Sequence, residues 1–188
     1  IAHTGYLLLG VLVAGKTDQG YGPVFLYLAS YTVMNLGAFG LVSLLAQRAD
    51  AGTNLHDLAG LSRKNPWLAF SMSVFLLSMA GIPPTAGFAA KYLLFSSAVQ
   101  AGEIWITVIA VLCSAISVYY YLRVLVYMYM REPAEAAGLA GRSWMTSAAV
   151  LAMILLTLQI GILPSRVMET ARAISRVTVV DAGPGATH

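Results

Sequence analysis

The residue best placed to do chemistry is Lys91, because it is the one charged residue in the apolar stretch 67–99. A charge in the centre of a membrane costs roughly 3 kcal/mol on insertion scales. An apolar environment disfavours the charged amine, whereas nearby water or a carboxylate restores it. A lysine balanced in this way can load and release a proton. The alternative is that Lys91 extends along its aliphatic stem to the membrane interface as an anchor.

Further polar side chains lie in other apolar stretches. Tyr27, Tyr31 and Asn35 follow at four-residue spacing, which places them on one face of a helix. Such a stripe either lines a hydrated path or forms hydrogen bonds between helices. His3 carries an imidazole, which ionises near neutral pH and suits a proton relay, although a lone histidine is equally a packing residue. We take these four residues as candidates for a proton path.

The stretch 104–130 holds a third polar group. It contains Ser114, Ser117, Arg123 and three consecutive tyrosines at 119–121. The tyrosines and the arginine are typical of the aromatic and cationic belt at a membrane interface. Glu103, in the short turn before this stretch, is expected to be solvated.

The composition places these residues in a membrane. Of all residues, 59% are hydrophobic and 10% are charged, whereas a soluble domain has about 25% charged residues. The net charge of +3 is spread over loops and indicates no nucleic-acid partner. The single cysteine, Cys113, is expected to be a small buried residue, and it excludes disulfides and the usual metal spacings. No nucleotide, flavin, iron–sulfur or zinc motif is present, so we expect no cofactor and no metal in this chain.

The sequence predicts an all-α membrane protein with about five transmembrane helices, at 1–14, 24–46, 67–99, 104–130 and 143–163. The third stretch would be ~50 Å long as a straight helix, against a hydrocarbon core of ~30 Å. Pro83 and Pro84 remove two backbone donors and clash with the preceding turn, so we expect the helix to break there. Breaks inside a membrane are tolerated where they are buried in protein or line a wet cavity, and ion-translocating proteins commonly contain them.

The ends and loops give further expectations. The chain begins at Ile1 in an apolar run too short to span ~30 Å, with no basic segment of a signal peptide, so we expect a C-terminal fragment of a longer protein. Residues 1–165 would form the membrane part and residues 166–188 a polar tail. The loop 47–66 is predicted to contain a short interfacial helix capped by Thr53 or Asn54.

Several segments resemble the antiporter-like membrane subunits of respiratory complex I. They are IAHTGY (1–6), LYLASYTVMNLGAF (26–39), DLAGLSRKNP (57–66) and SMAGIPPTAGFAAKYLLF (78–95). The similarity covers about residues 1–165 and is strongest to the subunit N type of bacterial NADH-quinone oxidoreductase. It implies that Lys91 belongs to a central hydrophilic axis that carries protons, with His3 and the polar residues of stretch 24–46 nearby.

The resemblance implies a proton-translocating subunit that couples electron transfer from NADH to quinone to proton pumping. NADH, flavin, iron–sulfur clusters and quinone would be bound by partner subunits, with no redox chemistry in this chain. Its partners would be other membrane-arm subunits, including neighbouring antiporter-like ones, and the lipid bilayer.

The resemblance also implies a multi-pass protein of the bacterial inner membrane. The loops 47–66 and 131–142 would lie on the cytoplasmic side, in agreement with a small excess of Lys and Arg there. Two alternatives stay open. One is a subunit of a multi-subunit cation/proton antiporter or a membrane-bound hydrogenase. The other is a structural membrane module in which Lys91 only anchors assembly.

Overall fold

The computed structural model describes residues 2–46, 54–132 and 144–163, and all regular elements in these ranges are helical. The elements are α1 (Ala2–Ala14), α2 (Gly22–Ala46), a 3₁₀ turn η1 (Leu55–Leu58), α3 (Leu61–Lys64), α4 (Pro66–Ala80), α5 (Ala86–Gln100), α6 (Ile104–Met130) and α7 (Trp144–Ile162). The predicted all-α class is therefore confirmed for the described ranges. The tail 166–188 lies outside them.

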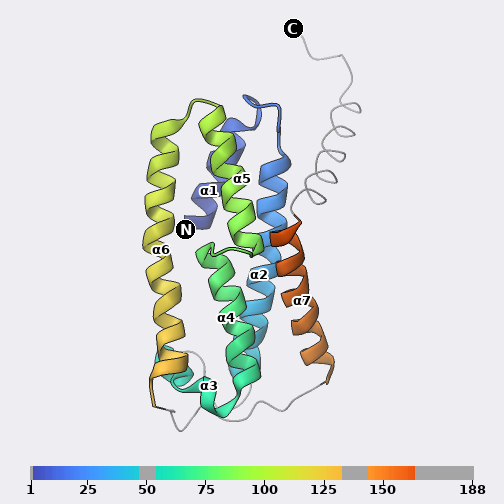
Figure 1. Ribbon diagram of the computed structural model, residues 1–188, viewed down its shortest axis with the longest axis vertical. Helices are drawn as coiled ribbons and strands as arrows, with labels where there is room; N and C mark the ends of the chain where they lie inside the picture. The colour runs from blue at the N-terminus through green and yellow to red at the C-terminus, as the bar shows by residue number, and fades with distance from the viewer. Residues whose placement is uncertain (1, 47–53, 133–143, 164–188) are drawn as a thin grey trace.

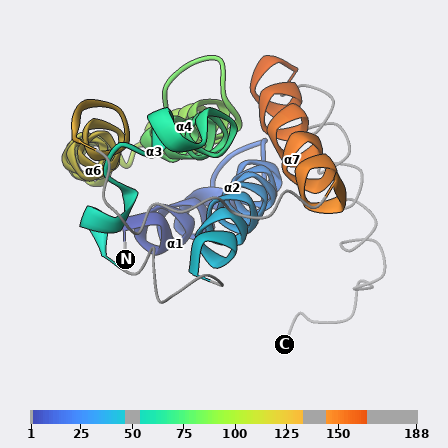
Figure 2. The same cartoon turned by 90° about the horizontal axis from the view of Figure 1, so that it is seen from below.

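The long helices run side by side along the long axis and alternate in direction (Figure 1). α4 and α5 are stacked end to end, with α6 on one side and α7 on the other. Seen along the axis, α1 and α2 form a second row against this first one (Figure 2). α2 contacts α4, α5 and α7, and α1 contacts α5 and α6. The stacked pair α4 and α5 is thus the centre of the bundle.

Two of the described helices are long and apolar enough to cross a membrane, over Gly22–Leu45 and Ile104–Met130. They correspond to the predicted stretches 24–46 and 104–130. α4 and α5 have 15 residues each, or roughly 22 Å at ~1.5 Å per residue. Neither half alone matches a ~30 Å core, but the stacked pair runs along the bundle beside full-length α6 (Figure 1).

The predicted break in the central helix is confirmed. α4 ends at Ala80 and α5 begins at Ala86, with Pro83 and Pro84 in the connection. Gly81 follows α4 with a φ of 89°, a left-handed conformation that glycine adopts without steric penalty. Thr85 precedes α5 in an extended conformation, and its hydroxyl donates to the Ile82 carbonyl at 2.7 Å.

The loop before α4 contains two single turns instead of the one short helix that was predicted. Gly60, with a φ of 63°, separates η1 from α3 because the chain turns there into the left-handed region. Asn54 is the N-cap residue of η1, as expected, and its backbone N–H donates to the Asp57 carboxylate at 3.0 Å. Thr53, the other candidate cap, lies outside the described residues.

The turns at the opposite end hold one ion pair. The Lys16 ammonium lies 2.7 Å from the Glu103 carboxylate and joins the α1–α2 connection to the start of α6. Glu103 stays partly exposed to solvent, as expected, with 27% of its side chain accessible. Its carboxylate has a cation partner because the two turns meet at the same end of the bundle.

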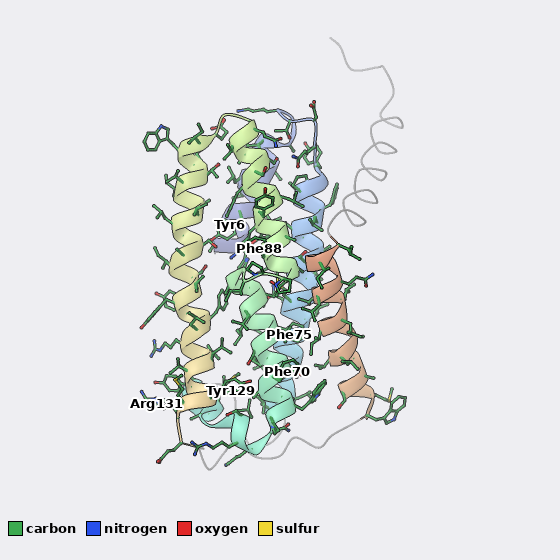
Figure 3. All side chains as sticks on the ribbon, in the orientation of Figure 1. Tyr6, Phe70, Phe75, Phe88, Tyr129 and Arg131 are labelled. Atoms are coloured by element: carbon green, nitrogen blue, oxygen red, sulfur yellow. The ribbon has the colours of Figure 1, made fainter. Side chains whose placement is uncertain are left out.

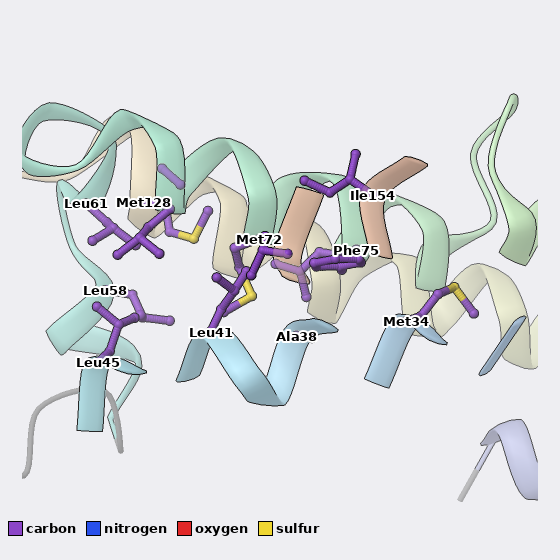
Figure 4. Close-up of a cluster of buried hydrophobic side chains, with 14 of the residues drawn as sticks. Met34, Ala38, Leu41, Leu45, Leu58, Leu61, Met72, Phe75, Met128 and Ile154 are labelled. Atoms are coloured by element: carbon purple, nitrogen blue, oxygen red, sulfur yellow. The ribbon is translucent and has the colours of Figure 1, made fainter. Parts of the chain in front are cut away.

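The core consists of two clusters of apolar side chains, one on each side of the break. The first joins α2, α4 and α7 through residues such as Leu41, Phe75 and Ile154 (Figure 4). The second joins α1, α2 and α5 and includes Tyr6 and Leu94. Between transmembrane helices, close packing rather than water exclusion drives association. The break therefore lies between two packed clusters that share helix α2.

Candidate functional site

Lys91 lies on the second turn of α5, and its side chain turns back toward the end of α4. The ammonium donates to the carbonyls of Met79 at 2.9 Å and Ala80 at 3.2 Å, and to the Ser114 hydroxyl at 2.9 Å. The residue is only 6% exposed. The anchor alternative requires the Lys91 side chain to extend to the membrane interface. In this structure the side chain is buried inside the bundle instead.

The position of Lys91 follows from the break itself. A helix leaves its last four carbonyls without intrahelical donors. At the end of α4, Leu77 and Ser78 accept from the backbone N–H groups of Gly81 and Ile82. The remaining two carbonyls accept from the Lys91 ammonium. The lysine thus satisfies the acceptors that the break exposes, at the negative end of the helix dipole.

Among the described residues, all the partners of the ammonium are neutral. Besides the two carbonyls and Ser114, the ammonium lies 5.7 Å from the centroid of the Tyr6 ring, within cation–π range. Among the described residues, no carboxylate lies within ion-pair distance of Lys91. The charge of the ammonium is therefore stabilised by two carbonyl dipoles, one hydroxyl and one aromatic ring. No negative charge among these partners locks Lys91 in its protonated form.

His3 forms a second polar centre, between α1, α2 and α6. Its Nδ1 lies 2.6 Å from the Tyr27 hydroxyl, and its Nε2 lies 2.9 Å from the Tyr121 hydroxyl. The Tyr31 ring is 4.8 Å from the imidazole centroid. Because each ring nitrogen faces a hydroxyl, a proton can enter at one nitrogen while another leaves from the other.

The predicted α2 stripe reaches this centre but does not continue to Lys91. Tyr31 and Asn35 line a recess of about 330 Å³ together with His3 and Tyr121. The Asn35 amide donates to the Tyr31 carbonyl of its own helix at 3.0 Å. Within the part of the chain that the structure describes, no hydrogen bond joins the stripe to the lysine.

Two residues of α6 complete the two centres: Ser114 at Lys91 and Tyr121 at His3. Tyr119 and Tyr120 are 64% and 61% exposed, as an interface belt requires. For Tyr121 the belt interpretation is wrong, because its hydroxyl contacts His3 inside the bundle. The signal was available in the sequence: Ser114, Ser117 and Tyr121, at i, i+3 and i+7, share one helix face.

The remaining candidate positions carry no further chemistry in the described ranges. Cys113 is exposed, so the expectation of a buried thiol is wrong. Cys113 precedes Ser114 on α6. The Ser114 side chain points toward Lys91 of α5, whereas the Cys113 side chain is on an exposed face of the helix. Among the described residues, no three or more metal-ligating side chains lie close enough together to hold a metal ion.

The fold and the site define an all-helical membrane protein organised around an interrupted helix that contains a buried lysine. The family model described as NADH:quinone oxidoreductase/Mrp antiporter, transmembrane, matches residues 1–117, which include His3, Lys91 and Ser114. The chain belongs to this family. The resemblance expected from the sequence is therefore confirmed.

Similar proteins come from several bacteria. NADH-quinone oxidoreductase subunit N of Trichlorobacter lovleyi is 45% identical over 92% of this chain and 35% of the relative. The subunit of the same name from Acidithiobacillus ferrooxidans is 42% identical over 89% of this chain and 34% of the relative. The chain thus spans about a third of the length of these relatives.

Solved structures show the same fold. A chain of respiratory complex I from Thermus thermophilus with bound aureothin has a TM-score of 0.75 and 35% identity, over 89% of this chain and 37% of that chain. A chain of the Mrp complex from Dietzia sp. has a TM-score of 0.77 and covers 90% of this chain and 39% of that one. Its identity is 23%, so this second likeness concerns the fold alone.

Proposed function

We propose that this chain is part of a proton-translocating membrane-arm subunit of NADH-quinone oxidoreductase, and that Lys91 is a proton-loading site in it. The observation that carries the proposal is the buried Lys91 ammonium with neutral partners only, at the end of a broken helix. The relatives named subunit N, at 42–45% identity, support the assignment to this enzyme rather than to an antiporter.

The geometry around Lys91 suits both protonation states. The ammonium has three donors and faces three acceptors, namely Met79, Ala80 and Ser114. After release of one proton, the amine retains two donors for the two carbonyls. Its lone pair then accepts from the Ser114 hydroxyl, which reverses the direction of that one hydrogen bond. No carbonyl loses its partner in the exchange.

The whole protein is proposed to be a multi-pass protein of the bacterial inner membrane. α1, α2, the α4–α5 pair, α6 and α7 would be its last five spans, so residues 1–165 would form the membrane part and 166–188 a polar tail. NADH, flavin, iron–sulfur clusters and quinone would be bound by partner subunits. The neighbours of this chain would be other membrane-arm subunits, including antiporter-like ones. His3, Tyr27, Tyr31 and Asn35 stay candidates for the proton path.

The test replaces Lys91 in the complete enzyme. Lys91→Ala and Lys91→Arg are each reconstituted in membrane vesicles, and proton pumping is measured per assembled complex during NADH oxidation. Both variants should lose most of their pumping, because alanine has no titratable group and a guanidinium does not release its proton at neutral pH.

The arginine variant separates proton loading from anchoring. It keeps the positive charge and several donors for the α4 carbonyls, so it should assemble in normal amounts. Lys16→Arg, at an exposed end of the bundle, is the matched control and should pump normally. Pumping near the wild-type rate in Lys91→Arg would show that Lys91 holds the helix end and does not load protons.

A further inference from the structure

We propose that protons pass between Lys91 and His3 along one face of α6, through Ser114, Ser117 and Tyr121 with Tyr6 of α1 beside them, and not along the α2 stripe. The inference rests on the proposed role of Lys91 and specifies the route that serves it. It assigns a relay role to hydroxyl groups that the sequence analysis did not count among the candidates for the proton path.

The Lys91 end of the route is a direct contact. The Ser114 hydroxyl is the one side-chain oxygen among the described residues that accepts from the ammonium, at 2.9 Å. The other two acceptors are backbone carbonyls, which have no proton to pass on. A proton that leaves Lys91 toward a protein group therefore leaves through Ser114.

The His3 end is also a direct contact, and it lies on the same face of the same helix. Tyr121 follows Ser114 by seven residues, or roughly 10 Å along the axis. Its hydroxyl lies 2.9 Å from His3 Nε2. Ser117 stands between the two on that face and donates to the Ser114 carbonyl at 2.7 Å. One helix face thus touches both titratable groups.

Tyr6 fills the space between these ends. Its side chain is 2% exposed, beside the break (Figure 3), and its hydroxyl forms no hydrogen bond with the described residues. The Tyr6 ring lies 5.7 Å from the Lys91 ammonium, which the Ser114 hydroxyl also contacts, and it packs edge-on against His3 with ring centroids 5.9 Å apart. Buried hydroxyls nearly always have a partner, so an unpaired one calls for an explanation.

A relay explains the unpaired hydroxyl. A hydroxyl both donates and accepts, so it can take a proton on one side and give one on the other. Rotation of the Ser114 or Ser117 hydroxyl, or one water molecule between the three oxygens, joins Tyr6 to the serines. In the structure the Ser117 hydroxyl donates to a backbone carbonyl of its own helix. Breaking this hydrogen bond costs little, so the hydroxyl can rotate toward Tyr6.

The transfer balances with no reactant other than water. The Lys91 ammonium gives a proton to the Ser114 oxygen, and the hydroxyl proton of Ser114 moves on to the oxygen of Tyr6 or Ser117, which passes on its own proton in turn. A water molecule carries that proton to the Tyr121 oxygen as the hydroxyl proton of Tyr121 moves to His3 Nε2, so each hydroxyl ends with one proton. The ammonium becomes an amine and the imidazole becomes an imidazolium, which can release its other proton toward Tyr27 at 2.6 Å.

The α2 stripe offers no equivalent connection. Asn35 donates to a carbonyl of α2 itself, and its amide cannot accept and release protons as a hydroxyl does. Tyr27 contacts His3 on the nitrogen opposite the one that faces α6. A proton that comes from Lys91 therefore reaches His3 before it reaches the α2 stripe.

The test compares two side chains of the same shape. Ser114→Thr keeps a hydroxyl, and Ser114→Val replaces it with a methyl group. In the complete enzyme in vesicles, Ser114→Val should pump about tenfold more slowly per assembled complex, and Ser114→Thr should stay near the wild type. A purely structural role of Ser114 would affect both variants alike.

A second variant guards against a folding defect at position 114. Tyr6→Phe removes only the hydroxyl, which has no partner to lose, and it should also slow pumping. Tyr92→Phe, on the exposed side of α5, is the matched control. Equal pumping by Ser114→Val and Ser114→Thr, or normal pumping by Tyr6→Phe, would overturn the α6 route.

The outcome separates the route from the proposed function. A larger loss with Asn35→Leu than with Ser114→Val would also overturn the route, in favour of α2. In that case Lys91→Arg would still abolish pumping, and the proton-loading role of Lys91 would stand. Normal pumping by Lys91→Arg would instead remove the basis of both proposals.

Discussion

Gly87→Ala should loosen the join between α4 and α5. Gly87 lies in the first turn of α5, and a Cβ there would overlap the carbonyl oxygen of Ser78 in the last turn of α4. It would also lie 3.2 Å from the Met34 sulfur. The Ser78 oxygen belongs to the backbone and cannot rotate away, so α5 itself would have to shift.

The size of the effect follows from two contacts. Overpacking a tight site costs about 1–3 kcal/mol. The Gly87 N–H donates to the Ser78 hydroxyl at 3.1 Å, and loss of this hydrogen bond adds about 1 kcal/mol. We therefore expect a loss of about 2–4 kcal/mol in the free energy of unfolding. Lys91 follows Gly87 by one turn, so the same shift should move the ammonium away from Met79 and Ala80.

Thermal unfolding of the detergent-solubilised protein tests this expectation. The control is Gly40→Ala, because a Cβ on Gly40 in α2 has no atom within 4 Å. That change should be neutral or stabilise by up to ~1 kcal/mol through helix propensity. If Gly87→Ala unfolds at the same temperature as Gly40→Ala, the close contact between the half-helices is not rigid and the reasoning fails.

Three further predictions concern other parts of the bundle. Gly161→Ala should lower the melting temperature of the solubilised protein relative to Gly40→Ala, since a Cβ there would overlap the backbone of Pro84 and Thr85; an unchanged temperature would contradict the contact. Glu103→Gln should change stability by less than ~1 kcal/mol and only at low salt, because its pair with Lys16 is largely solvent-exposed; a large loss in high salt would show that the pair is buried. With Cys113 replaced, Asp18→Cys and Glu132→Cys should react with an impermeant thiol reagent from opposite faces of the membrane, and labelling from one face would refute the alternating topology.

The sequence predicted the features that depend on neighbours along the chain. The limits of α6 agree with the predicted stretch 104–130, because charged or polar turns bound a long apolar run. The break at Pro83 and Pro84 was predictable because proline acts within one turn of its own position. The all-α membrane class likewise follows from composition and run length.

The partners of the candidate site could not be predicted in the same way. Lys91 binds backbone carbonyls, which every residue has and no residue type reveals. Tyr119, Tyr120 and Tyr121 are identical in sequence but point in directions about 100° apart on a helix. Only the placement of α1 against α6 decides that Tyr121 meets His3. The unpaired hydroxyl of Tyr6 depends in the same way on three helices meeting.

The location of the break has an electrical consequence. α4 and α5 place equal lengths of 15 residues on either side of it, and the Lys91 ammonium lies at the join. A charge that crosses the whole membrane gains or loses ~2.3 kcal/mol per 100 mV. A proton that reaches Lys91 from either face would cross about half of that field, or ~1.2 kcal/mol per 100 mV. The occupancy of Lys91 would then respond to the membrane voltage itself, with opposite sign for protons arriving from the two faces.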